Sequence, residues 1–263
     1  MSTRRNLIVP RGCSLIELMV ALSIGALISS GMIVIYGQAA RSFQYDESYS
    51  AMQENGHYAL QVLSDDLVMA DFWGEVIASD TIASTLTTTP PSCESAIGLF
   101  TGLNPIQVNN YHASPAQEQF TRCTALTAIH EPQTDILVVK RVSGAPTAEV
   151  FIDTADSDGD PNTTEVISSG VSALKSGKVY LRGNGIEASL INNASSESPP
   201  PTGEADWAYR PALYFIRQYT DSPGDGIPSL CRYTLSLTTS FGEEECLAEG
   251  IEDLHVEFGI DTD

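Results

Sequence analysis

The sequence predicts an α+β protein in which a long N-terminal helix packs on a C-terminal antiparallel β-sheet domain. No proline occurs between Arg11 and Pro90, so nothing forces a break in a helix there. From residue 73 onward, short β-branched runs alternate with turn residues, as strands do. The predicted parts are a cleaved basic leader (1–12), a transmembrane half of the helix (13–36), an amphipathic half (37–72) and an exported strand-rich domain (73–263).

A basic leader precedes an apolar stretch near the N-terminus. The leader holds Arg4, Arg5 and Arg11 and no acidic residue, and the nineteen residues from Leu18 to Tyr36 carry no charge. As a helix this stretch is about 28 Å long, close to the roughly 30 Å hydrocarbon core of a bilayer. Because basic residues stay on the cytoplasmic side, we expect a single membrane span with everything after it outside.

The small-residue site Gly12-Cys13 precedes the apolar stretch, whereas an ordinary secretory signal is cut after it. Cleavage after Gly12 would therefore remove the leader and keep the membrane helix. Glu17 is a carboxylate inside this segment, where burial costs about 2.5–3.5 kcal/mol on insertion scales. Either Glu17 reaches the headgroups from the helix end, or it pairs with the α-amine that cleavage frees on Cys13 of its own or a neighbouring subunit.

The helix is expected to continue beyond the membrane stretch, from about Ser14 to about Phe72. Apolar and small residues recur at spacings of three and four, which places them on one helical face. We expect the remaining chain to cover this face. Its members are Tyr45, Tyr49, Met52, Gly56, Ala59, Leu63, Leu67 and Ala70.

The exported part contains several β-branched runs bounded by turn residues. Gly183-Asn184-Gly185 forms a good hairpin turn between two of them. The segment 106–119 shows no clear period and is expected to be irregular, and 243–245 is expected to form a charged hairpin tip. The predicted strands cover 135–142, 148–152, 178–182, 186–191, 211–219, 231–237 and 255–260.

Five cysteines are present, of which Cys13 lies at the processing site. The other four, Cys93, Cys123, Cys231 and Cys246, lie in the exported part, where an even number favours two disulfides. Four cysteines allow three pairings. We favour Cys93–Cys123 and Cys231–Cys246 because each closes a short loop. Free buried thiols are the alternative, and a zinc site is disfavoured because no CxxC spacing occurs.

Charge and motif content exclude two classes of function. The formal net charge of −21 repels nucleic acid and anionic lipid headgroups, so no nucleic-acid binding is expected. The sequence contains no GxSxG, P-loop or HExxH motif, and its four histidines lie far apart. We therefore expect that the protein is not an enzyme.

An oxygen-rich cluster follows the predicted strand at 148–152. It comprises Asp156, Asp158, Asp160, Asn162 and Glu165. The first four place side-chain oxygens at alternate positions, as Ca²⁺ loops do. Two departures from an EF-hand are Pro161 at the sixth position and Glu165 at the tenth rather than the twelfth. The cluster is either a solvated acidic turn or a calcium site, and no other cofactor is expected.

The segment 12–21, Gly-Cys-Ser-Leu-Ile-Glu-Leu-Met-Val-Ala, resembles the class III signal of type IV pilins and type II secretion pseudopilins. The resemblance implies that a prepilin peptidase cuts after Gly12, that Cys13 becomes a methylated N-terminus, and that Glu17 guides subunit docking. The family usually has Phe where this chain has Cys13. The family architecture, a long helix on an antiparallel sheet, agrees with the fold predicted above.

The tail, residues 247–263, resembles a block found in PilW-type minor pilins. This resemblance implies a minor pilin that acts in the initiation and assembly of type IV pili, and so in twitching and adhesion, within a priming or tip complex. The implied partners are other minor and major pilins, the prepilin peptidase, the inner-membrane assembly platform and a PilY-type tip adhesin. The implied location is the inner membrane, with a periplasmic domain, and then the extracellular pilus.

Two alternatives to a PilW-type minor pilin stay open at this point. The first is a J-type minor pseudopilin of the type II secretion system, which would assemble in the same way in a different machine. The second belongs to another class and is a calcium-dependent adhesin or ligand-binding module displayed on a pilus. The cluster 153–165 and the proline-rich loop at 199–201 are the features that such a module would use.

Overall fold

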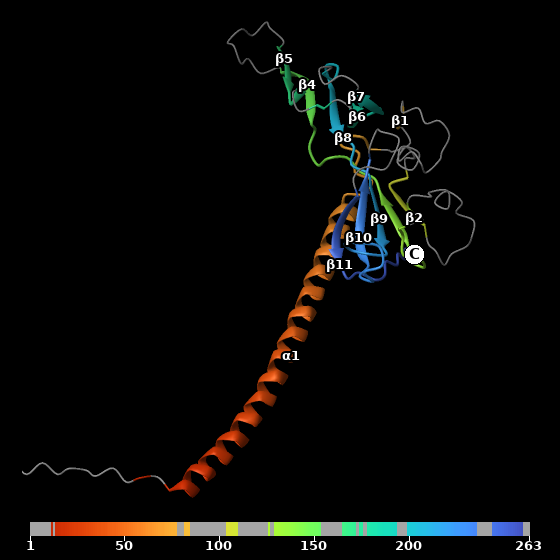
Figure 1. Ribbon diagram of the computed structural model, residues 1–263. Helices are drawn as coiled ribbons and strands as arrows, with labels where there is room; N and C mark the ends of the chain where they lie inside the picture. Colours follow the sequence, from red (N-terminus) through yellow and green to blue (C-terminus); the bar gives the residue numbers. More distant parts are fainter. Residues whose placement is uncertain are drawn as a thin grey trace, which may run out of the picture. The chain divides into compact units, whose positions relative to one another are not determined.

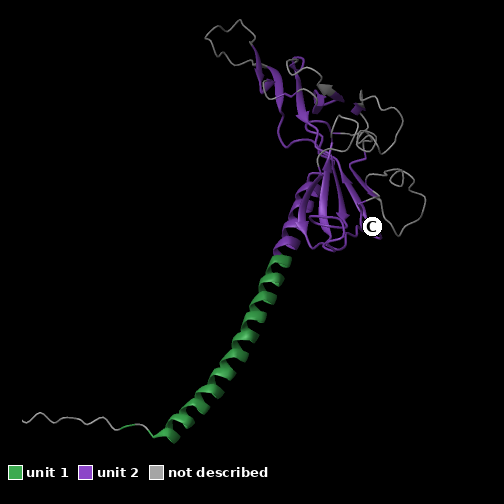
Figure 2. Cartoon of the chain, in the orientation of Figure 1, with its two compact units in different colours: residues 1–53 green, residues 54–263 purple. Residues whose placement is uncertain are grey.

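A computed structural model describes the protein at residues 12, 14–77, 82–84, 104–109, 126, 129–153, 165–171, 174–175, 178–193, 199–235 and 244–259. Within these residues there is one helix, α1 (Leu15–Val68), followed by eleven strands (Figure 1). The chain divides into two units, residues 1–53 and residues 54–263 (Figure 2). Helix α1 contributes to both units, and its last fifteen residues belong to the second. The predicted order of a long helix followed by a sheet domain is confirmed.

Helix α1 begins where the sequence predicts. The backbone N–H groups of Glu17 and Leu18 each donate to the carbonyl oxygen of Ser14 at 3.1 Å. Serine is a preferred residue at this position because its side chain can accept from the first free N–H groups of a helix. Glu17 stands in the first turn, where the helix dipole favours a negative charge.

The helix ends at Val68, four residues before the predicted end at Phe72. Asp71 adopts a φ of 66°, a left-handed conformation that a helix cannot contain. The turn carries Trp73 into the core, where it is 2% exposed and donates from Nε1 to Asp71 Oδ1 at 2.7 Å. Burial of this large side chain therefore redirects the backbone where the sequence pattern alone suggested more helix.

Six strands form one sheet in the order β1-β7-β6-β8-β4-β5. The pair β1–β7 is parallel, and every other pair in this sheet is antiparallel. The hairpin predicted around Asn184 joins β6 to β7, with Gly183 opposite Ala188. The strands are β1 (Ile82–Ser84), β4 (Ala148–Asp153), β5 (Glu165–Ser169), β6 (Lys178–Gly183), β7 (Ala188–Asn193) and β8 (Glu204–Ala208).

Five strands form the second sheet, in the order β11-β10-β9-β3-β2, and all of its pairs are antiparallel. The predicted strands at 135–142, 211–219 and 231–237 correspond to β3, β9 and β10, with shorter bounds. The strands are β2 (Ile106–Asn109), β3 (Ile136–Val139), β9 (Ala212–Arg217), β10 (Ser229–Thr234) and β11 (Glu244–Glu249).

Three predictions about these segments are wrong. The segment expected to be irregular contains β2, which pairs with β3 at the sheet edge. Glu244 and Glu245 lie in β11 rather than at a hairpin tip, because Arg217 and Arg232 pair with them at 2.7 Å and 2.6 Å. Strands β5 and β8 are absent from the predicted set. Strand β8 pairs with β4 and β6, whereas β5 pairs with β4 and β11 with β10, the strands that immediately precede them in the chain.

The strand predicted at 255–260 is also wrong over its described part, which has no regular secondary structure through residue 259. Gly250 leaves β11 in a left-handed conformation, with a φ of 74°. Beyond it, single hydrogen bonds hold the tail. Asp135 N–H donates to the carbonyl of Leu254 at 2.8 Å, and Val256 N–H donates to Asp135 Oδ2 at 2.9 Å. His255 Nδ1 also lies 3.0 Å from Asp135 Oδ2, and Ile251, Leu254 and Val256 pack on an apolar cluster, so the tail is fixed without a strand ladder.

The main core joins side chains from both sheets and from the turn after α1. Trp73 stacks on Tyr209 with ring centroids 6.1 Å apart, and Phe72 meets Trp207 edge-on at 6.0 Å. Gly74 has a φ of 69°, and a Cβ there would lie 2.7 Å from the Trp207 ring. Only glycine therefore fits this turn. The core also contains Val138, Val142, Leu181, Leu190, Leu213 and Phe215.

The last part of α1 packs on the five-stranded sheet (Figure 1). Ala59 is 4% exposed, and Asn55 Nδ2 donates to the carbonyl of Glu249 at 3.2 Å. The packed cluster contains Ala59, Val62, Leu63, Ala70, Leu137, Val139, Tyr214 and Ile216. The predicted face is thus covered only from about residue 55. Tyr45, Tyr49 and Met52 are more than half exposed, which corrects the prediction that the whole face is covered.

Lys140 is fully buried, and this burial lowers the pKa of its ammonium group to about 8. Between pH 8 and 10.5 the unfolded chain then binds a proton that the folded chain has lost, so stability should rise with pH. The rise amounts to about 3 kcal/mol over the whole interval between the two pKa values. Above pH 10 the buried tyrosines oppose it, because burial raises the pKa of Tyr209, Tyr214 and Tyr233.

Urea unfolding of the full chain at pH 7, 8, 9 and 9.5 should therefore show a free energy of unfolding that increases across this range. The variant Lys140→Met should be more stable than the wild type at pH 7 and insensitive to pH over the same range. A rise of the same size in Lys140→Met would show that another group causes it.

Candidate functional site

The first unit presents an apolar surface that no described residue covers. Every described residue from Ser14 to Gln53 is exposed. An apolar surface of this extent marks a site of contact with a membrane or another protein. Within the described residues, α1 is long and apolar enough to cross a membrane once. Its large apolar side chains include Leu18, Met19, Val20, Leu22, Ile24, Leu27, Ile28, Met32, Ile33, Val34 and Ile35, all more than half exposed.

Two serine hydroxyls of this segment, those of Ser23 and Ser30, bond within the helix. Ser23 Oγ donates to the carbonyl of Met19 at 2.7 Å, and Ser30 Oγ donates to that of Leu27 at 2.8 Å. A hydroxyl that donates to a carbonyl of the preceding turn needs no partner in the surrounding medium. The side of the helix that carries these serines is therefore compatible with lipid or with a second apolar helix.

Glu17 interrupts this surface in the first turn of α1. Its side chain is exposed, and it makes no ion pair with any residue in the described part of the chain. Cys13 lies outside the described residues, so its predicted pairing with Glu17 stays a prediction. The position at the helix N-terminus is favourable for the negative charge of Glu17. Removing the Glu17 carboxylate completely from water would also require a cation from a partner subunit.

Gly12 lies just before helix α1, which begins at Leu15. Among the described residues, a Cβ placed on Gly12 meets nothing within 4 Å, and its φ is not in the left-handed region. Neither packing nor backbone conformation therefore requires glycine here, in contrast to Gly74. A glycine that the fold does not need is compatible with recognition by another protein.

The predicted disulfide between Cys231 and Cys246 is present. It joins β10 to β11, whose register places the two residues opposite each other. The two sulfurs are thus unavailable as metal ligands, and Arg217 holds the neighbouring Glu244 carboxylate at 2.7 Å. The other predicted pair, Cys93 and Cys123, lies outside the described residues.

Removal of this disulfide should destabilise the second unit. The bond closes a loop with a sequence separation of 15 residues. A loop of that length corresponds to about 3 kcal/mol in the chain-entropy model. The double variant Cys231→Ala/Cys246→Ala should lower the free energy of unfolding by this amount in urea titrations. If the double variant and the oxidised wild type unfold at the same urea concentration, the bond does not stabilise the fold.

The predicted calcium cluster lies mostly beyond what the structure describes. Asp156, Asp158, Asp160 and Asn162 are outside the described residues. Glu165 begins β5, with its backbone paired opposite Asp153 of β4. The cluster therefore belongs to the connection between β4 and β5, and its ability to bind calcium stays a prediction.

A buried carboxylate that the sequence analysis did not single out connects α1 to the five-stranded sheet. Asp66 is 6% exposed, and its Oδ1 accepts from Arg141 Nε at 2.8 Å and from Nη2 at 2.6 Å. The hydroxyl of the fully buried Tyr214 donates to Asp66 Oδ2. Asp66 stands seven residues after Ala59, on the same helical face. A charged residue within the apolar face of the helix was the sequence feature that could have indicated a buried ion pair at Asp66.

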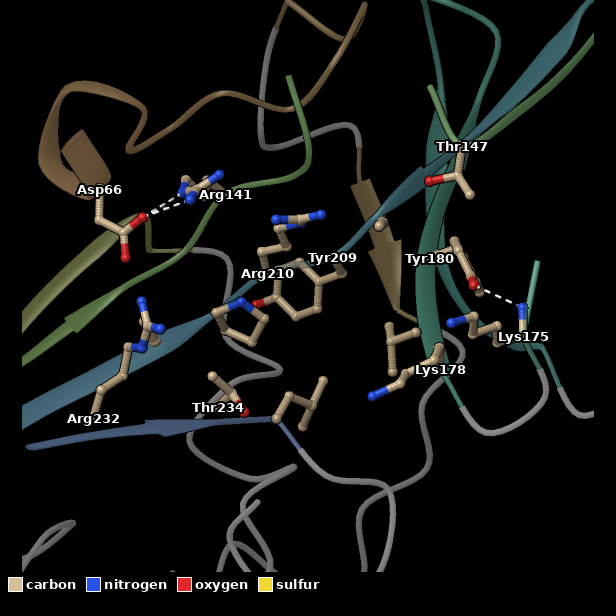
Figure 3. Close-up of a pocket in the computed structure, with 15 residues that line it drawn as sticks. Asp66, Arg141, Thr147, Lys175, Lys178, Tyr180, Tyr209, Arg210, Arg232 and Thr234 are labelled. Carbon is tan, nitrogen blue, oxygen red and sulfur yellow. Dashed lines mark hydrogen bonds and ion pairs between the residues drawn. The ribbon is translucent and has the colours of Figure 1, made fainter. Parts of the chain in front are cut away.

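Five cationic side chains line a cavity of about 460 Å³ next to this network (Figure 3). Apart from Lys175 and Lys178, they come from positions far apart in the sequence, and they form no contiguous basic run. They are Arg141, Lys175, Lys178, Arg210 and Arg232.

No family model, curated protein or solved structure matches this chain. Its function is therefore inferred from its own residues.

Proposed function

We propose that this chain is a minor pilin of the PilW type. In this proposal it is a membrane-stored subunit that the prepilin peptidase cuts after Gly12, and it then joins a complex of minor pilins that starts or caps a type IV pilus. The observation that carries the proposal is the uncovered apolar helix, with Gly12 before it and the exposed carboxylate of Glu17 in its first turn. The protein acts by assembly rather than by catalysis.

The helix surface supports this mode of action. A helix that is apolar on all sides can rest in a bilayer and can later pack against other apolar helices, because both surroundings are dry. Within the membrane segment, Glu17 breaks this pattern. A desolvated carboxylate is tolerated when a cation pairs with it, and the new α-amine of a neighbouring subunit supplies such a cation. The pair would set the axial register between subunits.

The attachment of α1 to the sheet supports the same proposal. Force on the helix during extraction from the membrane reaches the second unit through residues 55–70 of the chain. There the apolar cluster around Ala59 and the ion pair of Asp66 with Arg141 hold the helix to the sheet. The predicted pilin-like α+β architecture is thus present in the form that such a subunit needs.

The J-type pseudopilin of type II secretion would use the same helix and carboxylate. A deletion strain separates the two machines. We expect surface pili and twitching to be lost while exoprotein secretion continues, and a plasmid copy of the wild-type gene should restore both pili and twitching. Normal pili with lost secretion would assign the chain to the secretion system. If both pili and secretion are normal, neither assembly function stands.

A further inference from the structure

The cavity lined by the five cations lies where β6, β8, β9 and β10 come together in the second unit (Figure 3). In the view of Figure 3, the three arginines lie on one side of the hollow and the two lysines on the other, with Asp66 beside Arg141. The positive charge of the cavity lining is opposite in sign to that of the whole chain, which carries a formal net charge of −21 and thirteen Lys and Arg residues. Among the described residues of the lining, Asp66 is the one carboxylate.

Two of the cations are already paired. Arg141 holds Asp66, and Arg232 Nη2 donates to Glu245 Oε2 at 2.6 Å. Arg232 still has a buried Nε without a hydrogen-bond acceptor in the described part of the chain. A buried donor without an acceptor is unfavourable. The Arg232 side chain as a whole is 24% exposed and lines the cavity, so an anion bound there would lie near its positive charge.

The other three cations, Lys175, Lys178 and Arg210, are exposed. Among the described residues, no carboxylate oxygen lies within 4.0 Å of their side-chain nitrogens. Like charges around one cavity repel each other, and nothing in the described lining offsets this repulsion at the rim. A bound anionic ligand would offset this repulsion.

Apolar surface separates the cations. Val179, Pro211 and Leu235 line the cavity together with the ring of the buried Tyr209. A lining of this kind suits a ligand with both carboxylates and aliphatic carbon, as Glu and Asp side chains have. The cavity volume of about 460 Å³ is within the range of ligand sites and accommodates several side chains.

We propose that this cavity binds an acidic peptide segment of a partner protein. Carboxylates of the segment contact Lys175, Lys178 and Arg210 at the rim, and one reaches Arg232. The chain as a whole has a formal net charge of −21, which disfavours long polyanions such as nucleic acid. A short segment with two or three carboxylates fits within the positive area. The proposal does not depend on the function proposed above.

Fluorescence anisotropy of a fluorescein-labelled hexaglutamate peptide, titrated with the full chain in neutral detergent, tests this site. Saturable binding that weakens as salt is raised is the expected result, with no binding of the equivalent hexaglutamine peptide. The variant Lys175→Gln/Lys178→Gln/Arg210→Gln should bind the acidic peptide at least about tenfold more weakly. Because these side chains are exposed and make no ion pair in the described part of the chain, the variant should unfold at the wild-type urea concentration.

Two further arms make the result specific. Arg41→Gln removes an exposed cation of α1 outside the cavity and should bind like the wild type, whereas the single variant Lys178→Glu should bind more weakly. Equal binding by the wild type and the triple variant, or no binding at all, would overturn the proposal. Displacement of the peptide by inorganic phosphate or free glutamate at concentrations similar to its own would also overturn it, because the site would then be one for small anions.

Discussion

The variant Asp66→Ala is expected to lower the free energy of unfolding of the second unit by about 3–5 kcal/mol, the usual cost of removing one partner of a buried ion pair. The substitution leaves the guanidinium of Arg141 without its carboxylate, and it removes the acceptor of the fully buried Tyr214 hydroxyl. It also weakens the attachment of α1 to the five-stranded sheet.

Urea unfolding followed by tryptophan fluorescence measures this loss. Trp73 and Trp207 are the only tryptophans in the chain, and both are in the core of the second unit. The neighbouring Asp65→Ala is a matched control, since Asp65 is exposed and makes no ion pair with the described residues. The double variant Asp66→Ala/Arg141→Met should be less destabilised than the sum of the two single variants, because the pair acts as a unit. Equal stability of Asp66→Ala and Asp65→Ala would contradict this role.

The variant Glu17→Ala is expected to be processed normally and to leave cells with at least about tenfold fewer surface pili, the factor that a loss of about 1.4 kcal/mol in docking produces. Alanine cannot neutralise the amine of a neighbouring subunit, so both the register and the affinity of docking are lost. Stability of the second unit should not change, because Glu17 lies in the first unit and is exposed.

Counting pili by electron microscopy, with mature protein quantified in parallel, checks this prediction. Glu17→Gln preserves size but not charge and should resemble Glu17→Ala. Glu47→Ala, which removes an exposed carboxylate from the same helix beyond the apolar stretch, should resemble the wild type. A normal number of pili in cells with Glu17→Ala would contradict the proposed role of this carboxylate in docking.

Local patterns predicted the elements that local chemistry determines. The start of α1 follows from Ser14 and the apolar run after it, and the β6–β7 hairpin follows from the glycines around Asn184. The Cys231–Cys246 disulfide follows from proximity in sequence. In each case the residues that decide the structure lie within about one element of each other.

Features that depend on distant partners could not be predicted in this way. Asp66 stands in an apolar helical row, but the sequence does not show what pairs with it, because its partners Arg141 and Tyr214 lie 75 and 148 residues later in the chain. Glu244 resembles part of a solvated tip, because its partner Arg217 lies 27 residues earlier in the chain, in β9. The basic cavity collects cations between residues 141 and 232, and no spacing rule relates them.

The N-terminus of the protein in cells tests the central proposal most directly. Intact-mass and N-terminal analysis of membrane protein, from strains with and without prepilin peptidase, identifies the first residue. We expect a mature chain that begins at Cys13 with a methylated amine in the strain with the peptidase, and the full leader in the strain without it. An uncut chain in both strains would contradict the proposal that this protein is a processed pilus subunit.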